Sequence, residues 1–156
     1  DWMGLLPIAI ALGFAVLGLS QLIERKSLCR VNRSILIIGG FYVVVLAAYL
    51  LFETVVINYR PVLVDGKLEA SYPSSTTMLA LCIFPTAMLQ LRGRIRSAAV
   101  RKTVLCLLAA VTAILVVGRL ISGVHWLSDI LGGVFLSAGL VLLYAFICPE
   151  DSPSNA

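Results

Sequence analysis

The segment from Arg119 to Asp129 combines residue types that could transfer a phosphoryl group. It holds an arginine, then the only histidine of the chain six residues later, His125, and an aspartate four residues after that. On a helix, positions i and i+4 share one face, so the imidazole and the carboxylate are predicted to hydrogen-bond. A guanidinium supplies a fixed fork of donors that suits phosphate oxygens. A nucleophile, an orienting carboxylate and an anion clamp therefore favour phosphoryl transfer.

The same segment also fits a simple anchor at a membrane interface. Arg119 could extend its charge toward water, His125 and Trp126 could belong to an interfacial belt, and Asp129 could cap the next helix. On this segment alone the catalytic and the anchoring interpretation both stay open.

A second polar segment supplies further candidates for an anion site. Pro73 is followed by the hydroxyl residues Ser74, Ser75 and Thr76, a pattern that predicts a helix beginning here. Backbone amides at a helix N-terminus, together with the helix dipole, bind anions without a charged side chain. These residues could equally be helix caps alone, and Arg60, before a proline, could be a phosphate ligand or an interfacial cation.

The composition predicts a membrane protein. Sixty per cent of the residues are hydrophobic, only 13% are charged, and the mean hydropathy is +1.03. Because a bilayer leaves no water to pair the backbone, each long apolar stretch is expected to be a transmembrane helix. The expected helices cover residues 3–23, 35–57, 75–91, 103–121 and 127–148. We therefore expect an all-α bundle, with one domain over 1–148 and a short cytoplasmic tail over 149–156.

The positive charges predict the orientation of this bundle. Nine of the twelve basic residues lie in two loops, near 25–33 and 92–102, which the positive-inside rule places in the cytoplasm. Loops 58–74 and 119–128 then face the opposite side, as does the N-terminus. This placement leaves open whether a further helix precedes residue 1. The net charge of +4 indicates contact with anionic lipid, not nucleic acid. The short loops favour a bacterial plasma membrane.

The ordered motifs resemble the type 2 phosphatidic acid phosphatase superfamily, a family of integral-membrane lipid phosphatases. That family carries K-x6-R-P, P-S-G-H and S-R-x5-H-x3-D in this order. Arg60 with Pro61 matches the end of the first motif, and 73–76 aligns with the second. Arg119, His125 and Asp129 match the third. The resemblance covers 35–148, a family core of four helices to which residues 3–23 add one.

The resemblance implies a role for each matched residue. His125 is similar to the family nucleophile that forms a phosphohistidine, and Asp129 is similar to the carboxylate that orients it. Arg60 and Arg119 would bind the phosphoryl oxygens, helped by the Ser74 hydroxyl and the amides near Ser75 and Thr76. The family chemistry implies neither a metal nor another cofactor.

Three positions depart from the family motifs. Gly118 replaces a serine, Glu53 replaces the lysine of the first motif, and Thr76 replaces the histidine of the second. That histidine is the usual acid for the leaving group, so the role is unfilled unless Glu53, held protonated by burial, supplies the proton. Because the leaving group of a polyprenyl diphosphate is a lipid phosphate, a stable anion that needs little protonation, the change favours a polyprenyl diphosphate over a lipid monoester.

The departures leave two hypotheses open. The first is an enzyme that removes phosphate from a lipid phosphate or polyprenyl diphosphate. The second is a degenerate relative that binds lipid phosphate, or a protein partner, without turnover. The retained pair of His125 and Asp129 favours the enzyme, because a pure binder needs no nucleophile. The oligomeric state is not predictable from these patterns.

Overall fold

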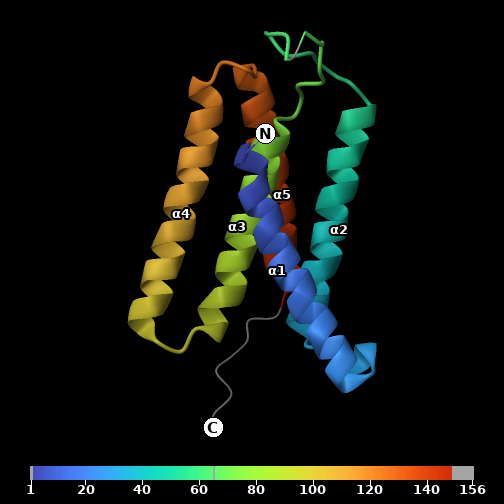
Figure 1. Cartoon of the computed structure of the whole chain (residues 1–156), viewed down its shortest axis with the longest axis vertical. Helices are drawn as coiled ribbons and strands as arrows, with labels where there is room; N and C mark the ends of the chain where they lie inside the picture. The colour runs from blue at the N-terminus through green and yellow to red at the C-terminus, as the bar shows by residue number, and fades with distance from the viewer. Residues whose placement is uncertain (1, 65, 149–156) are drawn as a thin grey trace.

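Five long helices make up the computed structural model over the residues that it describes, 2–64 and 66–148. They run alternately up and down as a bundle, with a short 3-10 helix, η1 (Leu28–Arg30), after the first of them (Figure 1). The five helices are α1 (Trp2–Arg25), α2 (Arg33–Thr54), α3 (Ser75–Arg94), α4 (Ala98–Ile121) and α5 (Leu127–Ile147). The predicted all-helical bundle is confirmed. The expected tail over 149–156 lies outside the described residues.

Three helix ends differ from the predicted ends by several residues, and one of them is the end of α3, which extends to Arg94 instead of stopping at residue 91. α4 begins at Ala98, before its apolar stretch, where the Ser97 side chain accepts from the Val100 amide at 3.5 Å. α2 stops at Thr54 instead of reaching residue 57. Residues 55–57 therefore belong to the loop that carries Arg60.

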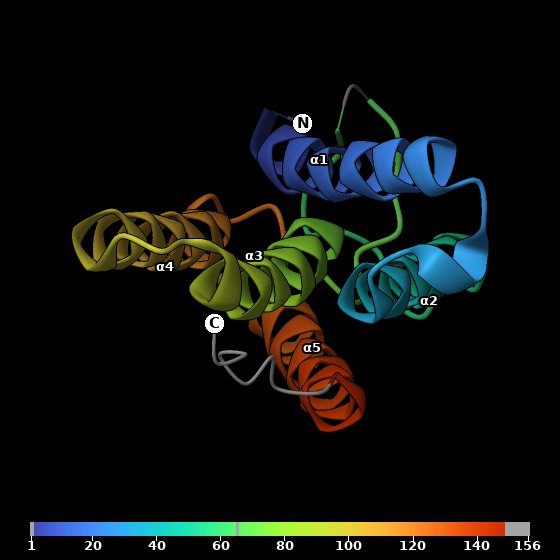
Figure 2. The same cartoon turned by 90° about the horizontal axis from the view of Figure 1, so that it is seen from below.

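α3 occupies the centre of the bundle. It contacts α1, α2, α4 and α5, and the view along the bundle shows it between α4 on one side and α1 and α2 on the other (Figure 2). Among the described residues, four helices are long and apolar enough to cross a membrane, namely α1, α2, α4 and α5. α3 is more polar, with Thr77, Thr86 and Gln90 buried. Its neighbours shield these groups from lipid.

A buried polar cluster joins α2, α3 and α5 at the end opposite the candidate site. Gln90 donates to the Tyr144 hydroxyl at 2.7 Å, and Arg94 donates to the Ser34 hydroxyl at 3.0 Å. The Tyr144 ring also packs on Phe41, with 5.1 Å between ring centroids. Because buried polar groups are costly without partners, this cluster fixes how the three helices meet.

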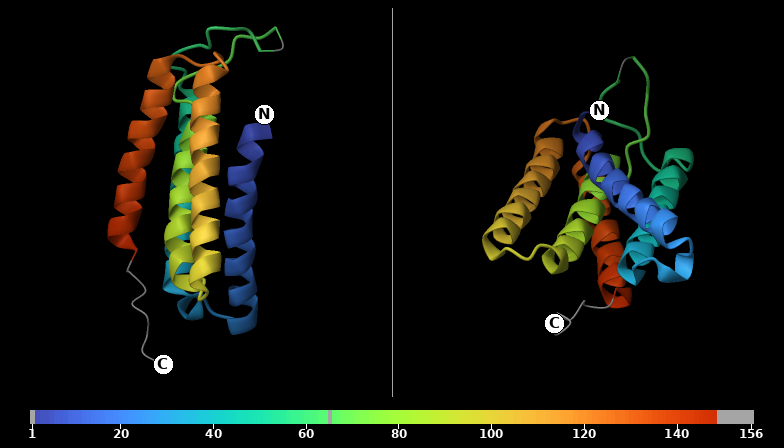
Figure 3. Two further views of the ribbon diagram at one scale, coloured as in Figure 1. Left: turned by 90° about the vertical axis from the view of Figure 1, so that its left-hand side faces the viewer. Right: turned by 60° about the horizontal axis from the view of Figure 1, so that its bottom comes forward.

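The connections between helices segregate by charge. The two basic loops share one end of the bundle, and the segments 55–74 and 122–126 share the other (Figures 1 and 3). The sequence-based grouping of the loops is therefore confirmed. All candidate phosphate ligands lie toward the end that lacks the basic loops.

Candidate active site

The turn between α4 and α5 positions the histidine. Gly123 has φ of +66°, a conformation that a side chain disfavours, and it lets the chain turn sharply after α4. His125 lies in this turn, two residues before α5 begins. The expectation that His125 and Asp129 share a helix face is therefore wrong. The imidazole Nδ1 lies 3.8 Å from Asp129 Oδ2, too far for a hydrogen bond.

Ser71 occupies the place between the two predicted partners. His125 Nδ1 lies 3.1 Å from the Ser71 carbonyl oxygen and 3.2 Å from its hydroxyl. The same hydroxyl donates a short hydrogen bond to Asp129 Oδ2. Sequence reasoning missed Ser71, whose only signal is its place in the polar loop just before Pro73.

Asp129 also caps α5. Its Oδ2 accepts from the Trp126 amide at 2.9 Å, which satisfies a donor in the first turn. The carboxylate is fully buried. The capping role predicted for Asp129 is therefore confirmed, and it coexists with the contact to Ser71.

The two candidate arginines have different surroundings. Arg119, in the last turn of α4, is 5% exposed and donates to Thr76 Oγ1 at 2.6 Å. Arg60 lies in the loop after α2, with its Nη2 3.2 Å from Glu69 Oε2 and its Nε 3.5 Å from the Ala70 carbonyl. Arg119 is thus held inside the bundle, whereas Arg60 is held by its own loop.

The N-terminus of α3 differs in detail from the prediction. Ser74 is the N-cap residue, as expected, but its side chain accepts from the Thr77 hydroxyl at 3.0 Å and caps no amide. The Ser74 amide donates to the Asp129 carbonyl at 3.0 Å. This amide is therefore engaged within the protein, and the predicted anion site depends on the amides of Ser75 and Thr76.

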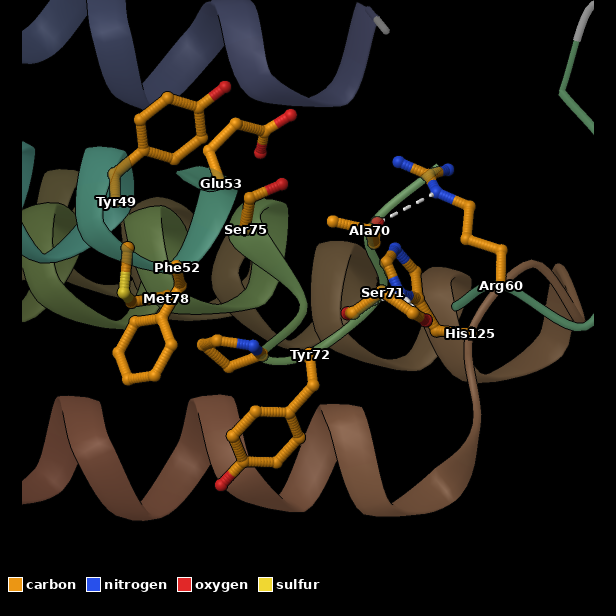
Figure 4. A pocket seen from close by; sticks show the side chains of 11 residues that line it. Tyr49, Phe52, Glu53, Arg60, Ala70, Ser71, Tyr72, Ser75, Met78 and His125 are labelled. Atoms are coloured by element: carbon orange, nitrogen blue, oxygen red, sulfur yellow. Dashed lines mark hydrogen bonds between the residues drawn. The ribbon is translucent and has the colours of Figure 1, made fainter. Parts of the chain in front are cut away.

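One pocket brings several predicted residues together (Figure 4). Arg60, Ser71, Ser75 and His125 line it, and so does Glu53 from the end of α2. The Glu53 side chain is exposed. Burial, the condition for its role as a substitute acid, is therefore not met.

The electrostatic surroundings of His125 favour its neutral form. Burial lowers its pKa below the usual 6.5, and the nearby charges of Arg60 and Arg119 lower it further, against the opposing effects of Asp129 and the Ser71 carbonyl. Because a carbonyl only accepts, the proton of the neutral ring sits on Nδ1. The other nitrogen, Nε2, is buried and has no hydrogen-bond partner among the described residues. This nitrogen therefore carries the lone pair of the neutral ring.

Metal ligands are sparse in the part of the chain that the structure describes. No three His, Cys, Asp or Glu side chains gather there in a way that could hold an ion. The polar groups at the site are arginines, hydroxyls, one imidazole and carboxylates, which suit anion binding and nucleophilic attack.

Comparison with known proteins identifies the family. The chain matches a solved structure described as the first transmembrane PAP2 type phosphatidylglycerolphosphate phosphatase from Bacillus subtilis, with 21% identity and a TM-score of 0.58. The match covers 99% of this chain and 81% of that one, and at this identity it establishes the fold. No curated protein matches. The model of the PAP2 superfamily matches residues 7–151, so the chain belongs to the PAP2 superfamily.

Proposed function

We propose that this protein is a membrane lipid phosphatase that works through a phosphohistidine on His125. The observation that carries the proposal is the state of the imidazole. Nδ1 is held by Ser71, Nε2 has no hydrogen-bond partner among the described residues, and the ring lines a pocket together with Arg60. Membership of a phosphatase superfamily supports the same chemistry.

The first chemical step is attack by His125 on phosphorus. The Nε2 lone pair forms the N–P bond while the bond from phosphorus to the leaving oxygen breaks, and that oxygen keeps the electron pair. Arg60 and Arg119 supply positive charge to the equatorial oxygens, where negative charge concentrates in the transition state. Covalent catalysis of this kind divides one difficult displacement into two easier ones.

The second step regenerates the histidine. Water attacks the phosphohistidine, the N–P bond breaks, its electrons return to Nε2, and inorganic phosphate leaves. The proton on Nδ1 stays in contact with Ser71 throughout, so the ring keeps one tautomer. Asp129, through its negative charge, stabilises the positive ring of the intermediate.

The substrate that this site favours is a polyprenyl diphosphate. Thr76 stands where the family has its acid, and its hydroxyl accepts from Arg119, so it orients a cation instead of donating a proton. A lipid alkoxide needs a proton to leave, whereas a lipid phosphate leaves as a stable anion. A phosphatidate-like monoester is the second candidate. The charge of the loops favours an outward-facing site at the plasma membrane.

A non-catalytic lipid-phosphate binder is the second candidate function. The observation that favours it is again the hydrogen bond from Arg119 to Thr76. With Thr76 in this role, the site holds two arginines to bind an anion but lacks the histidine that would protonate a leaving group. Both functions predict that vanadate or phosphate binds near Arg60 and Arg119, so binding alone does not separate them.

Phosphate release from purified protein tests the proposal. Wild type in detergent should release phosphate from a polyprenyl diphosphate faster than from a phosphatidate, and His125→Ala should abolish both. Arg60→Ala and Arg119→Ala should each weaken vanadate binding by about tenfold or more, the usual cost of a charge-assisted hydrogen bond. Vanadate binding without phosphate release would favour the binder. Full activity in His125→Ala would refute the phosphohistidine.

A further inference from the structure

The serine that links the histidine to the aspartate has a role of its own. We propose that Ser71 is the positioning residue of the site, and that Asp129 acts on His125 through the Ser71 hydroxyl. The proposal rests on the proposed function, in which His125 is the nucleophile. It differs from a direct pair of imidazole and carboxylate, since the carboxylate oxygen is 3.8 Å from Nδ1.

The proton positions of the three groups are mutually consistent. The Ser71 hydroxyl has one hydrogen, and it goes to Asp129 Oδ2, which only accepts. The hydroxyl oxygen is then an acceptor toward His125 Nδ1 at 3.2 Å, beside the Ser71 carbonyl at 3.1 Å. One N–H is thus shared between two oxygens of the same residue. Ser71 selects the tautomer with its carbonyl and relays the carboxylate charge with its hydroxyl.

Backbone hydrogen bonds within the loop hold the backbone around Ser71 in place. Its amide donates to the Asn58 carbonyl at 2.8 Å. Next to it, Ala70 pairs with Tyr59 as an antiparallel bridge. Ser71 itself is 1% exposed. The serine is therefore held by backbone contacts that do not depend on its hydroxyl.

The next residue fixes the segment from the helix side. The Tyr72 ring lies so close to Gly132 of α5 that a Cβ at this position would overlap it. The ring also meets Phe52 of α2 edge to face, with 6.2 Å between centroids. Because Tyr72 fills this gap between two helices, Ser71 cannot shift without moving the ring. The hydroxyl is thus presented to His125 from a rigid support.

The chain contains a single histidine, so one nitrogen-15 spectrum of histidine-labelled protein in detergent reports on His125 alone. Wild type should show a neutral ring with its proton on Nδ1. In Ser71→Ala the backbone carbonyl remains but the link to Asp129 is lost. The pKa of His125 should then fall further, because Arg60 and Arg119 still repel the proton while the Asp129 charge is transmitted less well. Turnover should drop by about tenfold or more, as expected for a lost bond to a charged partner.

Ser137→Ala is the matched control. Ser137 is another buried serine, 1% exposed, whose hydroxyl donates to the Met78 carbonyl at 3.2 Å within the bundle. The Ser137→Ala variant should leave the nitrogen-15 spectrum of His125 and the turnover rate unchanged. Ser71→Thr, which keeps the hydroxyl, should restore the wild-type tautomer and most of the activity.

A double-mutant cycle tests whether the effects of Ser71 and Asp129 pass along one path. If they do, Ser71→Ala, Asp129→Asn and the double variant should lose similar turnover, and the losses should not add. Additive losses, a His125 pKa that is unchanged or raised in Ser71→Ala, or a wild-type proton on Nε2 would each overturn the proposal. The spectra need no turnover, so they decide on Ser71 even if the phosphatase assay fails.

Discussion

Arg119 and Thr76 join the last turn of α4 to the first turn of α3 by a hydrogen bond of 2.6 Å between Nη2 and Oγ1. The threonine occupies the motif position at which the family carries its acid, and here it accepts a hydrogen bond from Arg119, the proposed phosphate ligand. The departure from the family motif therefore has a structural use. It also identifies the position at which substrate preference should be most easily changed.

Thr76→His should raise hydrolysis of a lipid monoester far more than that of a diphosphate. An imidazole beside the leaving oxygen would supply the missing proton, and general acids typically contribute about 100-fold or more. The measurement is the ratio of kcat/KM for the two substrates. Thr76→Val controls for loss of the contact to Arg119 and should weaken vanadate binding about tenfold without shifting the ratio. A constant ratio in Thr76→His would refute the leaving-group argument.

Removing the charge of Glu69 should tighten anion binding. Arg60 Nη2 lies 3.2 Å from Glu69 Oε2, so a phosphate that binds Arg60 must compete with this carboxylate. Because the Glu69 side chain is 43% exposed, water screens the pair. The gain in Glu69→Gln should therefore be modest, about two- to fivefold in vanadate affinity.

Titration calorimetry at low and high salt would measure that gain. The gain should shrink at high salt, since exposed ion pairs are screened. Glu24→Gln, an exposed carboxylate at the opposite end of the bundle, is the control and should leave affinity unchanged. Weaker binding in Glu69→Gln would show that Glu69 supports the site instead of competing with the ligand.

Turnover should persist below the ordinary pKa of histidine. The folded protein lowers the pKa of His125 below 6.5 through burial and two arginines, so the reactive neutral ring remains populated as the pH falls through 6.5. The acid limb of kcat/KM should then lie below pH 6.5. In Arg60→Ala one repelling charge is gone, so the residual activity should show a limb shifted to higher pH. An acid limb of kcat/KM above pH 6.5 in the wild-type protein would contradict a lowered pKa of His125.

The membrane orientation can be tested with one native and one introduced cysteine. Cys29 is exposed in a basic loop, and Lys67 is exposed in the loop at the other end. In intact cells an impermeant maleimide should label Lys67→Cys at once and Cys29 only after the membrane is disrupted. The Cys29→Ser variant shows how much labelling comes from the other cysteines. Lys67 is preferred to Gly66, whose φ of +73° favours glycine. The reverse labelling order would invert the orientation.

Sequence patterns predicted the five helices and singled out Arg60, Ser75 and His125, which the structure brings to one pocket, because apolar length and motif spacing are local properties. They could not predict the detail around His125, since that depends on the turn before α5 and on a loop more than fifty residues away. The i, i+4 rule assumed a helix that begins only at Leu127. Ser71 escaped notice because a single serine in a polar loop has no distinctive pattern until the fold places it beside His125.

The central position of α3 has a consequence for how the protein enters a membrane. α3 carries buried polar groups and two arginines in its last turn, so lipid is a poor solvent for it when it is alone. We therefore expect α3 to enter the bilayer together with helices that already lie there and can cover its polar groups. α1 and α2 precede it in synthesis and contact it in the finished fold. The helix that begins at the candidate phosphate site therefore relies on its neighbours for biogenesis as well as for shape.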